Sequence, residues 1–141
     1  SPPGRGVTLA MNEPLGTLGI VCPDENPLLG FISLLAPAMA AGNASVIIPS
    51  QRHPLAATDF YQVLETSDVP GGVVNIVTGR RADLTKTLAG HANLDALWYF
   101  ANDGGAKLVE AESVSNLKQT WCAPALPAGE REILRRATQV K

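Results

Sequence analysis

The chain has 141 residues, of which 45% are hydrophobic and 17% are charged, and its formal net charge is −2. This length fits one domain with a sizeable core, and the small net charge argues against nucleic-acid and anionic-membrane partners. The two cysteines, Cys22 and Cys122, exclude a disulfide framework and leave no Cys/His metal spacing, so we expect no metal site. Residues 1–6 lack a signal-peptide pattern, so we expect a cytoplasmic protein.

Residues 13–49 predict a strand, a buried helix and a second strand. Residues 16–22 and 45–48 are short apolar runs of the kind that form buried strands. Nearly every residue from 27 to 41 is apolar or small, so the helix between these strands should be buried on several sides. A strand, a helix and a parallel strand in this order form a right-handed βαβ unit.

The ends of this helix carry recognisable signals. Asn26 is a favoured capping residue, and Pro27 suits the first helical position. Gly42 and Asn43 suit a left-handed helix end. Pro37 lies inside the helix and removes one backbone donor, so we expect a kink or a loosened turn there.

Strands and helices continue to alternate along the rest of the chain. The predicted elements are a helix at about 54–67, a strand at 73–77, a helix at about 82–90 after the basic turn Arg80-Arg81, a strand at 94–99, a helix ending near Glu112, and a strand at 117–122. This alternation predicts an α/β fold, a Rossmann-like three-layer sandwich with a mostly parallel sheet of about five strands and helices on both faces.

We divide the chain into three parts. Residues 1–15 are interpreted as a leader and hairpin, residues 16–122 as the Rossmann-like domain, and residues 123–141 as a proline-rich linker and C-terminal segment. Within the last part, residues 129–141 favour either an amphipathic basic helix or the entry to a strand beyond residue 141, and we expect this segment to lead to an assembly strand.

Several stretches resemble the start of the cofactor-binding half of an aldehyde dehydrogenase, and they follow the same order. They are EPLG at 13–16, LAPAMAAGN at 35–43, PS at 49–50, VPGGVVNIVTG at 69–79, KLV at 107–109 and SNLK at 115–118. The resemblance covers about four fifths of the chain. It implies a parent enzyme that uses NAD to oxidise aldehydes to carboxylic acids.

Ligands of open parallel sheets bind beyond the carboxyl ends of the strands, so the turns that follow the strands are the candidate sites. The family has Pro-Trp-Asn-aromatic-Pro in the first turn, and the asparagine donates a hydrogen bond to the developing oxyanion. This chain has Glu25 in place of that asparagine, between Asp24 and Asn26. A carboxylate only accepts hydrogen bonds and repels negative charge, so Glu25 cannot replace the donor. The simpler interpretation is that acidic residues at a helix start are favoured by the helix dipole.

Two further family positions lack the side chains that the chemistry needs. The family motif Lys-Pro-Ser-Glu, whose lysine bonds the cofactor ribose, corresponds here to Ile48 through Gln51, with no basic residue and no acid. The family's general base lies in a Glu-Leu-Gly-Gly segment after SNLK, and Ala123 stands at that glutamate. Alanine cannot transfer a proton.

The turn at 101–106 lacks the family's glycines. The family has Thr-Gly-Ser-x-x-x-Gly, and ungapped alignment places Ala101 and Ala106 at the glycines and Asn102 at the serine. Two methyl groups therefore enter the space where backbone approaches the pyrophosphate. Gly104 and Gly105 offer a substitute loop after a small shift in register.

The cysteines and histidines are not predicted to be catalytic. Cys22 and Cys122 lie at strand ends and are interpreted as small packing residues. His53 and His91 lie in predicted turns and are expected to be solvated.

Family 16 of the aldehyde dehydrogenases is the more specific resemblance, because its members carry a second, degenerate repeat after the catalytic unit. The segments NEPLGTLGIVCPDENPLL, LWYF and LRRATQVK are similar to that repeat. The resemblance implies a non-catalytic repeat with an assembly role, no cofactor on this segment, and NAD for the parent. The implied partners are the catalytic domain of the same protein and, in a homodimer, a second copy.

Two alternatives remain open. In the first, the chain still binds NAD through a rearranged loop at Gly104 and Gly105. In the second, it is the retained NAD(P)-binding domain of an active aldehyde dehydrogenase whose catalytic cysteine lies in a separate domain.

Overall fold

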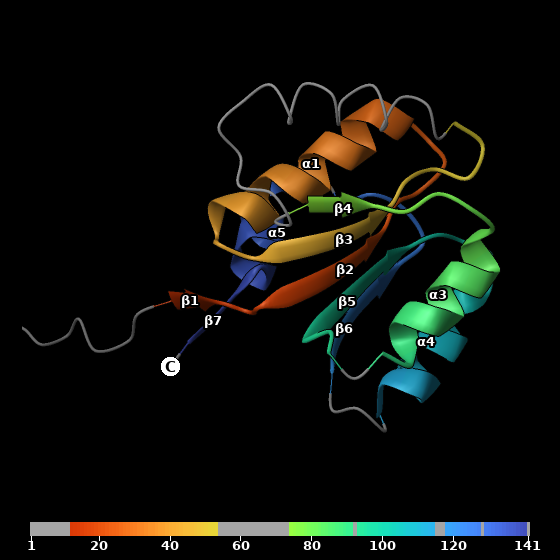
Figure 1. Cartoon of the computed structure of the whole chain (residues 1–141). Coiled ribbons are helices and arrows are strands. Elements are labelled where there is room, and N and C mark those ends of the chain that lie inside the picture. The colour runs from red at the N-terminus through yellow and green to blue at the C-terminus, as the bar shows by residue number, and fades with distance from the viewer. Residues whose placement is uncertain (1–11, 54–73, 92, 115–117, 128, 141) are drawn as a thin grey trace, which may run out of the picture.

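The structure is a computed structural model that describes residues 12–53, 74–91, 93–114, 118–127 and 129–140 (Figure 1). The helix predicted at about 54–67 lies outside the described residues, and so does the first strand of the hairpin predicted within residues 1–15. The strand predicted at 73–77 is described from residue 74, and the strand predicted at 117–122 is described from residue 118.

A five-stranded parallel sheet forms the middle layer, as the alternation of strands and helices predicts. Its order is β4-β3-β2-β5-β6. The strands are β4 (Val74–Ile76), β3 (Ala44–Ile48), β2 (Thr17–Val21), β5 (Ala96–Phe100) and β6 (Gln119–Ala123). Ile20 of β2 pairs with Ile47 of β3 on one side and with Trp98 of β5 on the other. The strand order reverses beside β2, which is where a sheet of this kind binds ligands.

Helices cover both faces of this sheet (Figure 1). On one face lie α1 (Pro27–Ala40) and α5 (Glu130–Arg136), and on the other lie α3 (Arg81–Ala89) and α4 (Gly105–Val114). The α/β three-layer architecture predicted from the sequence is therefore confirmed.

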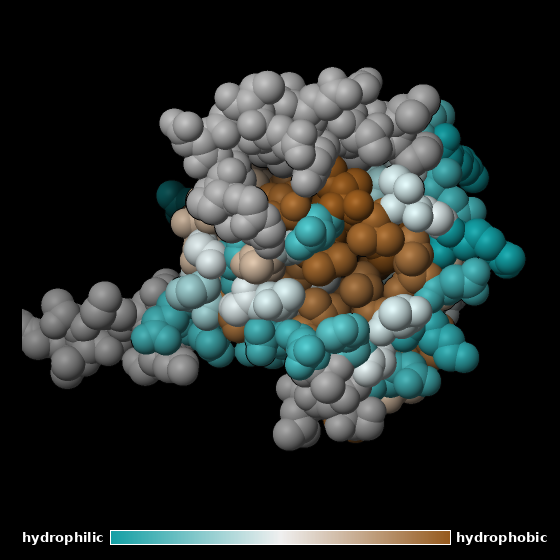
Figure 2. All heavy atoms as spheres, in the orientation of Figure 1, coloured by the Kyte–Doolittle hydropathy of each residue, from teal (hydrophilic) through white to brown (hydrophobic). Residues whose placement is uncertain are grey.

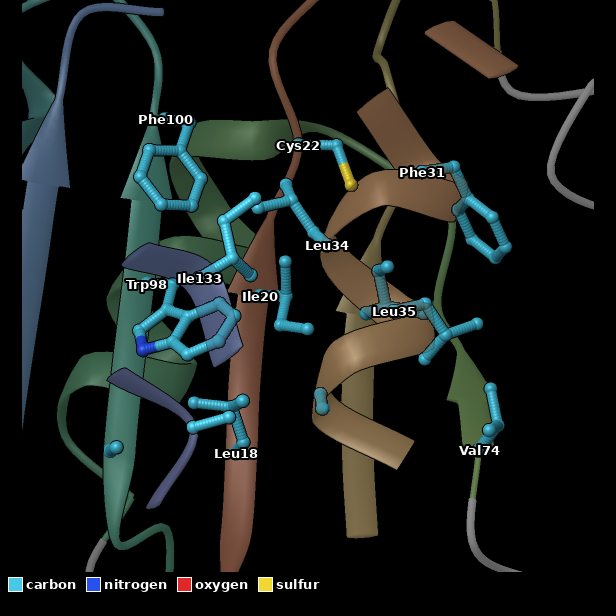
Figure 3. Close-up of a cluster of buried hydrophobic side chains, with 14 of the residues drawn as sticks. Leu18, Ile20, Cys22, Phe31, Leu34, Leu35, Val74, Trp98, Phe100 and Ile133 are labelled. Carbon is cyan, nitrogen blue, oxygen red and sulfur yellow. The ribbon is translucent and has the colours of Figure 1, made fainter. Parts of the chain in front are cut away.

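The larger hydrophobic core lies between the sheet and the α1–α5 layer (Figure 3). Its fully or almost fully buried side chains include Leu18, Ile20, Phe31, Leu34, Leu35, Trp98, Phe100 and Ile133. The ring of Trp121 meets the rings of Trp98 and Phe100 edge-on, with centroid distances of 5.3 and 5.0 Å. Each large apolar side chain buried in this way stabilises the fold by about 2 kcal/mol.

Helix α1 begins and ends where the sequence predicts, but its first cap differs. Asn26 adopts a left-handed backbone conformation, with φ of 49°, and its side chain makes no capping hydrogen bond. At the other end, Gly42 has φ of 92°, and the amides of Gly42 and Asn43 donate to the carbonyls of Met39 and Ala38. This pair of bonds is the Schellman arrangement that closes a helix.

The expectation that α1 is buried on several sides is wrong for its first turn. Leu28 and Leu29 are 46% and 59% exposed, whereas Phe31, Leu34 and Leu35 are buried. Helix α1 packs against β3 and α5, and neither element covers the outer side of the first turn. The all-apolar sequence of α1 therefore includes a flank that its neighbours leave open.

The described residues between 123 and 140 contain the end of one strand, a helix and a further strand. Ala123 ends β6, and α5 packs on α1. The strand β7 (Thr138–Val140) then pairs antiparallel with β1 (Asn12–Pro14) in a separate two-stranded sheet. The helix that was one alternative for residues 129–141 forms as α5, and the strand β7 lies inside the chain, which the sequence did not predict.

The side chain of Asn43 joins this C-terminal segment to the rest of the fold. Asn43 is 1% exposed. Its Nδ2 donates to the carbonyl oxygens of Ala38 (3.2 Å) and Ala137 (2.8 Å), and its Oδ1 accepts from the amide of Gly16 (3.0 Å). One buried amide thus satisfies backbone groups from three separate segments.

Candidate functional site

The candidate site lies beyond the carboxyl ends of β2, β3 and β5. Asp24 follows β2, Ser50 and Gln51 follow β3, and Asp103 follows β5. Arg81, the first residue of α3, joins them. Because the carboxyl ends of parallel strands share one edge of the sheet, these residues from distant parts of the sequence meet there.

One oxygen of Asp24 receives donors from two other turns. Its Oδ1 accepts from the Ser50 hydroxyl (2.9 Å), from the backbone amides of Gln51 (3.0 Å) and Arg52 (3.4 Å), and from Nη2 of Arg81 (2.6 Å). Burial by itself raises the pKa of Asp24, but the hydrogen bonds from Arg81 and Ser50 outweigh it and lower the pKa to about 2. Asp24 is therefore ionised at neutral pH and holds three segments together.

Arg81 links two carboxylates across the edge of the sheet. Its side chain is 8% exposed, and its Nη2 and Nη1 lie 2.6 Å from Asp24 Oδ1 and 3.4 Å from Asp103 Oδ2. Burial disfavours the charged guanidinium, but the hydrogen bond to Asp24 and the attraction of both carboxylates outweigh it and raise the pKa of Arg81. The backbone amide of Arg81 also donates to Gln51 Oε1 (2.9 Å).

Asp103 extends the cluster to Tyr99 and to the start of α4. Its Oδ1 accepts from the Tyr99 hydroxyl and from the backbone amide of Gly105 (3.0 Å). Burial and then the neighbouring Asp103 raise the pKa of Tyr99 above its ordinary value. Burial also acts to raise the pKa of Asp103, but hydrogen bonds from Tyr99 and Gly105 lower it on balance. The result is a neutral phenol bonded to an ionised carboxylate.

We name these four residues, Asp24, Arg81, Tyr99 and Asp103, the ion-pair cluster. It contains two anions and one cation, so its net charge at neutral pH is negative. Sequence reasoning did not assign Arg81, Tyr99 or Asp103 to a site. A usable signal existed, because charges of opposite sign follow strand ends that a parallel sheet brings to one edge.

The residues that sequence comparison did single out lie in different environments. Glu25 is exposed beside Asp24, and Ile48 is 2% exposed in the smaller core beneath α3 and α4. Gln51 is exposed but bonds α3 through its side chain. Ala123, opposite Phe100 in the sheet, is half-buried and packs against the larger core.

The turn after β5 places its alanines and glycines differently. Ala101 is buried and Ala106 is half-buried in the smaller core, whereas Asn102 is exposed. Gly104 has φ of 81° and open space where a Cβ would lie. A Cβ on Gly105 would collide with the Tyr99 hydroxyl, so packing within the protein requires glycine at that position.

Neither cysteine has the surroundings of a nucleophile. Cys22 is fully buried, and burial raises the pKa of its thiol. Burial, and then the nearby Glu110, raise the pKa of the Cys122 thiol to about 11. Both thiols therefore stay protonated at neutral pH, in agreement with their interpretation as packing residues. His53 and His91 are exposed, as predicted.

The described residues contain neither a group of metal-ligating side chains nor a membrane-spanning helix. No group of three or more His, Cys, Asp or Glu side chains there is arranged to hold a metal ion. No helix in the same residues combines the length and apolar character needed to cross a membrane.

Comparison with known proteins decides the family. The sequence profile of the aldehyde dehydrogenase family matches residues 3–122. The chain belongs to the aldehyde dehydrogenase family. It is 34% identical over 110 residues to aldehyde dehydrogenase family 2 member C4 of Arabidopsis thaliana, covering 77% of this chain and 22% of that protein. It is 31% identical to the NADP/NAD-dependent aldehyde dehydrogenase PuuC of Escherichia coli, covering 82% of this chain and 23% of that protein.

Solved structures of aldehyde dehydrogenases share the fold. PnpE from Pseudomonas sp. WBC-3 superposes with a TM-score of 0.78 and 28% identity, over 82% of this chain and 24% of that one. Betaine aldehyde dehydrogenase from Staphylococcus aureus, solved in complex with NAD+, superposes with a TM-score of 0.77 and 23% identity, over 82% of this chain and 23% of that one. The chain thus spans about a quarter of the length of its aldehyde dehydrogenase relatives.

Proposed function

We propose that this chain is a non-catalytic aldehyde dehydrogenase-like repeat, similar to the second repeat of family 16, within a longer NAD-dependent enzyme. Its role is to pack against the catalytic domain of the same protein and to support assembly, including a homodimer. Nucleic acids and membranes are not among the proposed partners, and the proposed compartment is the cytoplasm. NAD serves the parent enzyme and does not bind this segment.

The ion-pair cluster is the observation that carries this proposal. A dinucleotide pyrophosphate is anionic and is normally held by backbone amides and helix N-termini at this edge of the sheet. Here Asp24 and Asp103 occupy that edge, and Asp103 already takes the Gly105 amide at the start of α4. Two carboxylates against one guanidinium repel a further anion. The residues present therefore do not fit a bound pyrophosphate.

The positions that would perform the chemistry support the same reading. Glu25, at the position of the oxyanion donor, is an acceptor and is exposed. Ala123, at the position of the general base, is an alanine at the end of β6. Cys22 and Cys122 remain protonated thiols. We derive no catalytic step through these residues.

Exposed apolar surface supports the assembly role. Figure 2 shows hydrophobic residues gathered in the middle of this view, with hydrophilic residues at the borders. Leu28 and Leu29 add exposed apolar side chains at the first turn of α1. Continuous apolar areas on a protein surface mark interaction sites. A catalytic domain in the same parent protein would cover such a surface.

The alternative is that this chain is the NAD(P)-binding domain of an active aldehyde dehydrogenase. One observation favours it: Gly104 has φ of 81° and open space around it, so the backbone there is accessible to a ligand. Under this reading, the Gly104-Gly105 loop holds the cofactor, and a domain elsewhere in the parent supplies the nucleophile.

Calorimetric titration of NAD into the 141-residue chain separates the two readings. The non-catalytic proposal predicts no saturable heat, whereas Escherichia coli PuuC, measured in parallel, should bind. Saturable binding with a micromolar dissociation constant would overturn the proposal and favour the alternative. Substituting Cys122, the half-buried cysteine, by serine in the full parent should leave turnover unchanged, and a loss of turnover with unchanged thermal stability would place chemistry here.

A further inference from the structure

The donors around Asp24 form an anion site in their own right. The Ser50 hydroxyl, the amides of Gln51 and Arg52, and the Arg81 guanidinium all converge on one carboxylate oxygen. A carboxylate oxygen has about two lone-pair positions, whereas four donors surround this oxygen of Asp24. The donors therefore outnumber the lone pairs that this one oxygen offers. Converging backbone amides, a hydroxyl and a guanidinium are the donor set by which proteins bind free anions.

These donors are built into the fold independently of Asp24. Ser50 is 1% exposed, and its Oγ also accepts from the amide of His53 (3.2 Å), which fixes the hydroxyl within its turn. The backbone of Arg81 is held by Gln51 Oε1, and its buried Nε has no hydrogen-bond partner. A buried arginine with unused donor capacity retains affinity for an anion.

We propose that Ser50, Gln51, Arg52 and Arg81 form a carboxylate-binding site, and that the side chain of Asp24 occupies it as an internal ligand. The external ligand that the site would take is a small monocarboxylate, because the group it now holds is a carboxylate. Asp24 is attached to the turn beside the site, so it competes at a high effective concentration and excludes external carboxylates in the wild-type chain.

The test is rescue of an Asp24→Ala chain by formate. The substitution removes the internal carboxylate and leaves Arg81 buried with weaker compensation, so thermal unfolding of the 141-residue chain should shift down by roughly 5 °C or more. Formate, titrated against chloride at constant ionic strength, should restore at least half of that loss and should saturate. The wild-type chain should show no difference between the two salts, because its site is filled.

Three variants make the result specific. Asp83→Ala removes an exposed carboxylate paired with Arg80, and neither a stability loss nor a formate response is expected. Asp24→Asn keeps the site filled, so it should be less destabilised than Asp24→Ala and should not respond to formate. Adding Arg81→Gln to Asp24→Ala should abolish the response.

Several outcomes would overturn the proposal. The proposal fails if Asp24→Ala is as stable as wild type, or if that chain stays unfolded in formate. It also fails if formate stabilises Asp24→Ala no more than chloride does, or if formate stabilises Asp83→Ala as well. Recovery with inorganic phosphate but not with formate would overturn the assignment to carboxylates. This inference does not rest on the proposed function, since NAD titration and formate rescue report on different variants and different ligands.

Discussion

The two edges of the sheet differ in whether charged side chains pair with one another. At the amino ends of the strands, Asn43 bonds three backbone groups, and Asp95 accepts from the backbone amide of Thr17 at 2.8 Å. At the carboxyl ends, side chains also bond the backbone, but Arg81 in addition bonds the carboxylates of Asp24 and Asp103. The ion pairs between side chains are what distinguish the second edge.

This difference separates the contacts that hold the fold from those that build the candidate site. Asn43 belongs to the family-like segment LAPAMAAGN, and its bonds hold the ends of α1, α5 and the loop before β2. The ion-pair cluster lies where a family member is expected to bind its cofactor, and the protein's own groups satisfy it. Side chain-to-backbone bonds hold the scaffold at one edge, while ion pairs join the turns at the opposite edge.

The largest effect should come from the amino edge. We expect Asn43→Ala to lower the free energy of unfolding by about 3 kcal/mol, because it removes the side-chain partners of the half-buried Gly16 amide and of the buried Ala137 carbonyl. Urea denaturation at neutral pH measures this change. The matched control is Asn93→Ala in an exposed turn, which should stay within about 0.5 kcal/mol of wild type. Equal effects at the two positions would contradict the importance of this edge.

A smaller effect is expected at the carboxyl edge. Arg81→Gln should cost about 2 kcal/mol, since it leaves two carboxylates close together without a cation, although Asp103 is partly solvated. The adjacent Arg80 has a side chain that is 82% exposed, so Arg80→Gln should cost at most about 0.5 kcal/mol. A double-mutant cycle of Arg81→Gln with Asp24→Asn should give a coupling energy above about 0.5 kcal/mol. Additive losses would show that the pair is not coupled.

The smallest effect is a dependence on pH. The pKa of Asp24 is lowered from its ordinary 3.8 to about 2, so the folded state favours the ionised form. The stability from this carboxylate is therefore fully present above about pH 4 and is lost as pH falls toward 2. Asp24→Asn should be less stable than wild type at neutral pH and should approach it near pH 2. Parallel pH curves for the two chains would contradict the prediction, and Asp83→Asn serves as the control.

Much of the fold could be predicted, because it depends on local patterns. The apolar runs that became β2 and β3, the proline at the start of α1, and the glycine at its end act over a few residues. The exposed flank of α1 was not predictable in this way. Leu28 and Leu29 look like core residues in sequence, and only the positions of β3 and α5 decide which side of a helix is covered.

The sequence identified some positions of the candidate site but not the contacts between its residues, because those contacts join distant parts of the chain. Comparison with the family identified the positions where donors and a base are missing, such as Glu25 and Ala123. It could not identify what fills the space. Asp24, Arg81 and Asp103 are separated by 57 and 22 positions along the chain, so their pairing has no local signal.

The sequence by itself therefore determined the alternation of strands and helices and the family, because each of these is a pattern of residue type and spacing. Only the tertiary structure decided that β7 pairs with β1, that Asn43 joins three segments, and that Arg81 bridges two carboxylates. These are contacts between distant residues, and they depend on how parallel strands bring their ends to a common edge.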